Sequence, residues 1–91
     1  MAEAVRLYYR PEADTLDLWL GEPREDEAEP LTDNVVVKLR RGRPVGLEVL
    51  QVSRLSPEDL DALPPRLREA LADALDRLAA ARSALRRRQR P

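Results

Sequence analysis

The chain has 91 residues and a mass of 10.4 kDa, a size that fits one small domain. Its sixteen basic and seventeen acidic residues give a net charge of −1, and it has neither histidine nor cysteine. This composition excludes histidine general bases, cysteine nucleophiles, disulfides and zinc sites built on either residue. Because the sequence has no membrane-length hydrophobic run and no signal peptide, we expect a cytoplasmic protein without membrane contact. All but one of the basic residues are arginine, which suits a GC-rich or a thermophilic source.

The two parts of the chain differ in pattern and in charge. Residues 1–55 alternate apolar and polar side chains, as strands do, and carry eight basic against eleven acidic groups. Residues 56–91 are rich in alanine, leucine and arginine at helical spacing and carry eight basic against six acidic groups. We expect one compact domain, with a sheet from residues 1–55 and a helical extension from residues 56–91.

The alternation predicts four strands, at residues 5–9, 16–20, 35–39 and 45–49. Their short connections predict an antiparallel meander with one apolar face. The core residues expected on that face are Val35, Val37, Leu47 and Val49.

The connections between these strands carry turn residues. Residues 11–14 begin with a proline that presets φ for a tight turn, and Gly42 allows positive φ in the turn at residues 40–44. Residues 21–30 contain five acids and two prolines, and we expect them to form an exposed loop. Gly46 indicates either a bulge or a close backbone approach within the last strand.

The second part predicts a short helix and a long one. Ser56 is a good cap for a helix that begins at Pro57, and the tandem prolines 64–65 end it after about two turns. A long amphipathic helix follows at residues 66–88. The predicted fold class is therefore α+β, a four-stranded antiparallel β-meander followed by a short helix and a long C-terminal amphipathic helix.

Three segments in the first part resemble a known family. Residues 9–20 (YRPEADTLDLWL) resemble the pattern Tyr-Asp-x-Glu-Ala-Asp-x-Leu-Tyr-Ile-x-Leu, and residues 33–39 and 42–50 resemble its Val-Val-Val-Asp-Tyr-Asp and Gly-x-Val-Val-Gly-Ile-Glu-Ile-Leu segments. This pattern belongs to a small prokaryotic family, the domain of unknown function 2283, and the resemblance covers about residues 5–55. The sequence departs from it at Arg10, Asp17, Lys38 and Arg40.

The resemblance implies a small β-meander followed by helix, with no established enzymatic activity. For some members it implies an antitoxin-like role as partners of small ribonuclease-like toxins. The arginine-rich second part lies outside the resemblance.

The residues themselves also argue against an enzyme. Ser53, Ser56 and Ser83 have no histidine base, and Lys38 has no Ser-x-x-Lys motif. Carboxylates around the first turn (Glu12, Asp14 and Asp17) suit Ca²⁺, Mg²⁺ or acid–base chemistry, but their spacing matches no calcium loop and a turn-stabilising role is favoured. We therefore expect no catalytic, cofactor-binding or metal site and no cofactor.

Two surfaces suggest nucleic acid as an alternative partner. Arg6, Tyr8 and Trp19 are expected on one face of the sheet, where they suit base stacking, although cross-strand pairing or burial is favoured. The C-terminal arginines suit phosphate contacts, although cations also complement a helix C-terminus and keep it solvated. This possible nucleic-acid contact comprises Arg82, Arg86, Arg87, Arg88 and Arg90.

The long helix either folds back over its own sheet, the simpler explanation for a single amphipathic helix, or takes part in self-association, which its length favours. At about 34 Å it is longer than strands of about 20 Å, so its far end would leave an apolar stripe in water. A second copy would cover that stripe through Leu71, Leu78, Ala81 and Leu85. The functional prediction is a self-associating, non-enzymatic protein-interaction module that forms a homodimer. A more specific version of this prediction is an antitoxin-like regulator of a small toxin partner. The alternative function is nucleic-acid binding through the C-terminal arginine cluster.

Overall fold

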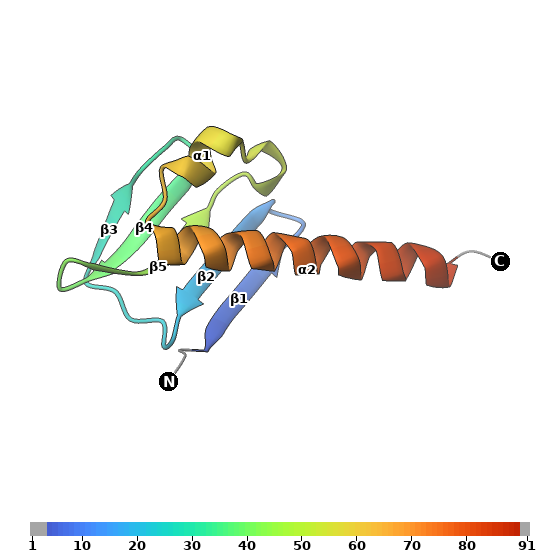
Figure 1. The fold of residues 1–91 in the computed structure, drawn as a ribbon, viewed down its shortest axis with the longest axis horizontal. Coiled ribbons are helices and arrows are strands. Elements are labelled where there is room, and N and C mark those ends of the chain that lie inside the picture. Colours follow the sequence, from blue (N-terminus) through green and yellow to red (C-terminus); the bar gives the residue numbers. More distant parts are fainter. Residues whose placement is uncertain (1–3, 90–91) are drawn as a thin grey trace.

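A computed structural model describes residues 4–89, and leaves out the side chains of residues 85, 86, 88 and 89. It confirms the α+β class. An antiparallel sheet forms one layer, and a long helix lies across one of its faces (Figure 1). In chain order the elements are β1 (Val5–Arg10), β2 (Thr15–Leu20), β3 (Glu27–Pro30), β4 (Val35–Arg40), β5 (Arg43–Val49), the 3₁₀ turn η1 (Val52–Arg54), α1 (Pro57–Asp61) and α2 (Pro65–Gln89).

The sheet has five strands, and the prediction of four is wrong. The additional strand, β3, lies within the segment expected to be a loop and pairs with β4 from Glu27 opposite Leu39 to Pro30 opposite Val36. All four of its residues are exposed, so the strand pairs through its backbone alone. Its sequence therefore shows no alternation of apolar and polar residues. Pro30 is tolerated because β3 is an edge strand.

The strand order also differs from the predicted meander. The sheet runs β1-β2-β5-β4-β3, so β2 pairs with β5 rather than with the strand that follows it. The connection after Gly21 carries the chain to the opposite edge, where β3 begins. The β1–β2 hairpin and the β3–β4–β5 meander are thus joined by the pairing of β2 with β5.

The core lies between this sheet and the helices. All four predicted core residues are confirmed, since each is at most 3% exposed. The core also receives Leu16, Leu18, Leu63, Leu67, Leu71 and Ala74.

The turn between β4 and β5 forms as predicted. Arg41 and Gly42 have positive φ of 51° and 76°, the backbone of a two-residue hairpin turn that matches strand twist. Close approach is what Gly46 permits, because a Cβ there would lie 2.7 Å from the Leu18 carbonyl oxygen and 2.7 Å from Cε3 of Trp19. A bulge adjoins Gly46 as well, because Lys38 and Leu39 are consecutive on β4 whereas their partners on β5, Gly46 and Pro44, are separated by Val45.

The helix boundaries follow the proline and serine signals. Ser56 caps α1 in a capping box: its Oγ accepts from the Asp59 N–H, and the Asp59 carboxylate accepts from the Ser56 N–H at 3.0 Å. α2 begins at Pro65 and ends at Gln89, one residue beyond the predicted helix at each end. Within the described residues, no helix is long and apolar enough to cross a membrane.

Asp59 is buried and joins α1 to the turn before β4. Its Oδ2 also accepts a hydrogen bond from Nδ2 of Asn34 at 3.3 Å. The backbone hydrogen bond from Ser56, then a side-chain bond from Thr32, lower the pKa of Asp59 from 3.8 to about 2, while burial opposes the shift.

This lowered pKa predicts a pH-dependent contribution to stability. Ionised Asp59 stabilises the fold above pH 3.8, and the contribution is lost as the pH falls through about 2. We expect Asp59→Asn to lower the urea midpoint at pH 7 and to lower it progressively less as the pH approaches 2. Asp61→Asn, at an exposed position of the same helix, is the matched control. An equal loss at pH 7 and pH 2 would contradict this role for the Asp59 charge.

Candidate interaction surfaces

The helix α2 extends beyond the sheet that it covers. It crosses β5, β2 and β1 and then continues past the β1 edge towards the C-terminus (Figure 1). Its 25 residues correspond to about 37 Å of helix. The overhang, defined here as residues 83–89, follows Arg82, which contacts β1.

Arg82 and Tyr9 mark the point where α2 leaves the sheet. Nη2 of Arg82 donates to the Tyr9 hydroxyl oxygen at 2.5 Å, and the guanidinium carbon lies 5.7 Å from the centroid of the Tyr9 ring. A hollow of about 110 Å³ lies beside them, lined in addition by Val52, Leu75, Leu78 and Ala79. This contact joins residues 73 positions apart, and no local pattern in the sequence indicates it.

The structure separates the four residues proposed for self-association. Leu71 is fully buried and packs inside its own domain, so its assignment to an interface is corrected. Leu78 is partly buried against the same core, and Ala81 is exposed. The side chain of Leu85 lies outside the described residues, although its backbone belongs to α2.

The C-terminal arginines are not one uniform surface. Arg82 bonds to Tyr9, and Arg87 is exposed. The side chains of Arg86 and Arg88, and all of Arg90, lie outside the described part of the chain.

The sheet face opposite α2 brings together the predicted aromatic and basic residues. Arg6 pairs with Trp19 and Tyr8 with Asp17 across β1 and β2, so all four share one face. Asp17 in turn pairs with Glu48 of β5. Two neighbouring carboxylates at the middle of this face disfavour a phosphate backbone there.

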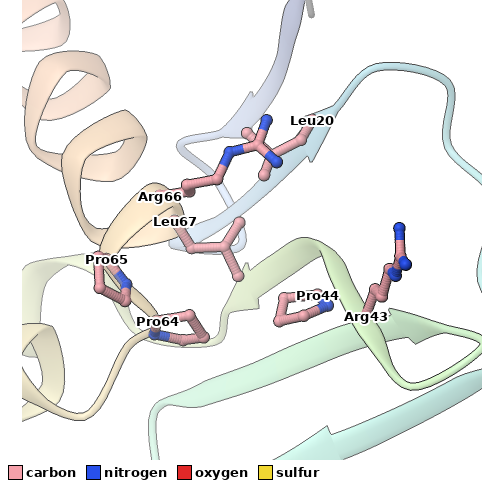
Figure 2. Close-up of a pocket in the computed structure, with 7 residues that line it drawn as sticks. All are labelled: Leu20, Arg43, Pro44, Pro64, Pro65, Arg66 and Leu67. Atoms are coloured by element: carbon pink, nitrogen blue, oxygen red, sulfur yellow. The ribbon is translucent and has the colours of Figure 1, made fainter.

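A pocket at the start of α2 was not predicted from the sequence. It has a volume of about 350 Å³, and Figure 2 shows rings of Pro44 and Pro64 near Leu67, with Arg43 and Arg66 on either side. Leu20 and Pro65 complete its lining. The lining has no carboxylate, hydroxyl or amide side chain, so it lacks groups for acid–base or nucleophilic chemistry. The tandem prolines were the available signal, but they indicated only a helix boundary.

The tip of the β4–β5 hairpin is basic. Arg40, Arg41 and Arg43 line a hollow of about 430 Å³ with Val45. This hollow shares Arg43 with the apolar pocket.

Three carboxylates of the acidic segment at residues 21–30 have partners within the chain. Glu25 lies 3.4 Å from Nζ of Lys38, Glu22 pairs with Arg24 at 3.0 Å, and Oδ2 of Asp26 accepts from the Arg41 N–H at 3.1 Å.

Asp14 has a structural role, but its carboxylate bonds to Ser53 rather than to the turn amides expected from the sequence. Its φ is 55°, and its carboxylate accepts from both the N–H and the hydroxyl of Ser53, 39 positions away. It thereby fastens η1 to the β1–β2 turn. Among the residues described, no group of three or more histidine, cysteine, aspartate or glutamate side chains could hold a metal ion.

The segment that forms the sheet also identifies the family of the chain. Residues 6–53 match the family described as "Protein of unknown function (DUF2283)". The chain belongs to this family. The DUF2283 match includes nearly the whole sheet and part of η1, whereas α1 and α2 follow it. Neither the curated proteins nor the solved structures include a significant match to the chain.

Proposed function

We propose that this DUF2283 protein is a non-enzymatic protein-interaction module that self-associates through the end of α2. The observation that carries this proposal is the course of α2 past the β1 edge (Figure 1). The overhang of residues 83–89 is a short helical segment, and short helical segments are marginal in water unless an apolar side packs against another surface. A second copy of the chain supplies such a surface.

The composition of α2 supports the proposal. Ala79, Ala80 and Ala81 are exposed where the helix leaves the sheet, and these small side chains allow close approach of another element. The domain itself is small, and chains of this size bury only roughly two-thirds of their unfolded surface. Association therefore adds burial that the monomer lacks.

A charge placed on the outgoing helix tests this proposal. Ala81→Glu is expected to raise the dimer dissociation constant at least about tenfold, because a carboxylate in the contact must lose its hydration. Sedimentation equilibrium at several protein concentrations measures the constant, and circular dichroism verifies that the variant folds. Ser83→Glu introduces the same charge two residues later, on the far side of the helix, and is expected to have little effect. Equal effects of the two variants would contradict a specific contact at Ala81.

The finer role stays a prediction. An antitoxin-like function requires a small protein partner, which affinity capture followed by reconstitution from purified components would identify. The alternative is nucleic-acid binding through the C-terminal arginines, of which Arg82 already bonds to Tyr9 within the chain.

A further inference from the structure

The two edges of the sheet are protected to different degrees. β3 has four residues, of which two are glutamates and the last is Pro30, and such features block pairing with another strand. β1 has six residues without proline or glycine, and Val5 and Tyr8 are 48% and 49% exposed. Within the described residues, no strand pairs with the outer side of β1. β1 is therefore the edge open to strand addition.

The hydrogen bonding of β1 to β2 shows which backbone groups face outwards. The Gly21 N–H donates to the Ala4 carbonyl oxygen at 2.8 Å, so these two residues form a hydrogen-bonded pair of the antiparallel ladder. Such pairs alternate along a strand. Arg6, Tyr8 and Arg10 consequently bond to β2, whereas the N–H and C=O groups of the residues between them point to the free edge.

These outward groups belong to Val5, Leu7 and Tyr9. A second copy of β1 can pair with them around a two-fold axis through Leu7, which places Val5 of each copy opposite Tyr9 of the other. On the opposite face, Arg6 then lies opposite Tyr8 of the second copy, a favourable cation–aromatic pair.

The alternative registers are less favourable. Shifting the axis by one residue towards Tyr8 keeps the same outward groups but places Arg6 opposite Arg10 of the second copy. The opposite shift, towards Arg6, sets the two Arg6 side chains against each other. Like charges directly opposite one another destabilise a strand pair. Among these three registers, the sequence of β1 therefore favours the one centred on Leu7.

The course of α2 fits the same arrangement. α2 crosses β1 at Tyr9, two residues from the two-fold axis, so the two helices lie antiparallel and side by side on one face. The overhang of seven residues is about 10 Å long, or about two strand spacings. It would extend over β1 and β2 of the second copy, next to the exposed Val5 side chain.

We infer that the β1 edge is the self-association site, where two copies pair their β1 strands antiparallel about Leu7 and form one continuous ten-stranded sheet. This inference rests on the proposed self-association and adds the β1 edge to the surface that the end of α2 provides. The overhang of each α2 then covers the junction. The partner is a second copy of this chain.

A single cysteine provides a direct test, because the natural chain has none. In the inferred register the two Leu7 Cα atoms lie about 5.5 Å apart, within the range that a disulfide bridges. Leu7→Cys in the full-length chain is expected to give a covalent dimer under mild oxidation. Ala28→Cys on the exposed β3 edge is the matched control and is expected to stay largely uncrosslinked.

A charge exchange tests the register without relying on access to a partly buried thiol. Tyr8→Arg places arginines opposite each other twice per dimer, and we expect the dissociation constant to rise at least about tenfold. Arg6→Glu combined with Tyr8→Arg instead places a glutamate of each copy opposite an arginine of the other, and we expect this double variant to recover most of the loss.

The outcomes separate this inference from the broader proposal. Crosslinking of the Leu7→Cys variant together with recovery by the exchanged pair supports the β1 edge. If the natural chain is dimeric but the Leu7→Cys variant does not crosslink and the Tyr8→Arg variant dimerises normally, the β1 edge is overturned and self-association stands. A natural chain that remains monomeric overturns both.

Discussion

Replacing Leu71 with alanine is expected to lower the free energy of unfolding by about 3 kcal/mol, because it leaves a cavity at the centre of the interface between α2 and the sheet. Leu71 is fully buried, and its neighbours along α2, Leu67 and Ala74, share the same core. A domain of this size has a total stability of roughly 5–10 kcal/mol, so the variant is expected to lose much of it. Urea denaturation followed by circular dichroism measures the change.

Leu50→Ala provides the control for this prediction. Leu50 is 40% exposed, so the same chemical change is expected to alter stability by less than about 0.5–1 kcal/mol. Equal losses at Leu50 and Leu71 would contradict the packing of α2 against the sheet.

Substitution of Gly46 by alanine is expected to lower the free energy of unfolding by about 2 kcal/mol, through overpacking against β2. The added Cβ would lie 2.7 Å from both the Leu18 carbonyl oxygen and the Trp19 ring. The ring can move, but the carbonyl belongs to the backbone of β2, an inner strand, and cannot shift without disturbing the β2–β5 pairing.

A double-mutant cycle separates these two contacts. Trp19→Leu removes the ring, and we expect Gly46→Ala to cost less in that background while remaining destabilising, because the carbonyl contact persists. Chemical denaturation of the four proteins measures the coupling. A Gly46→Ala protein as stable as the natural chain would contradict the close approach of β5 and β2.

Local patterns in the sequence predicted the elements whose formation depends on local chemistry. The alternation in β1, β2, β4 and β5, the turn at Gly42 and the cap at Ser56 each place a physical requirement on neighbouring residues. The β3 strand was not predictable in this way, because its exposed residues pair only through the backbone. The pairing of β2 with β5 was not predictable from local patterns either, because it depends on how the β1–β2 hairpin docks against the β3–β4–β5 meander.

The candidate surfaces show the same division. The repeat of Leu71 and Leu78 correctly indicated an amphipathic helix, but the pattern did not distinguish packing against the chain's own sheet from packing against a second copy. The structure places Leu71 in the monomer core and leaves the exposed Ala81 where the helix leaves the sheet. The open β1 edge was not apparent, because strand order determines which strands are edges.

The DUF2283 match ends before the helix that covers the sheet. Residues 6–53 supply the sheet side of the core, whereas Leu63, Leu67, Leu71 and Ala74 come from the segment that follows. In this member of the family, the matched region and the following helices therefore form a single core. The same α2 helix that completes this core also carries the overhang.

Sedimentation equilibrium of the full-length chain tests self-association most directly. A self-associating chain is expected to show a concentration-dependent mass that approaches twice the 10.4 kDa of a single chain. A mass that remains at 10.4 kDa up to millimolar concentration would contradict it.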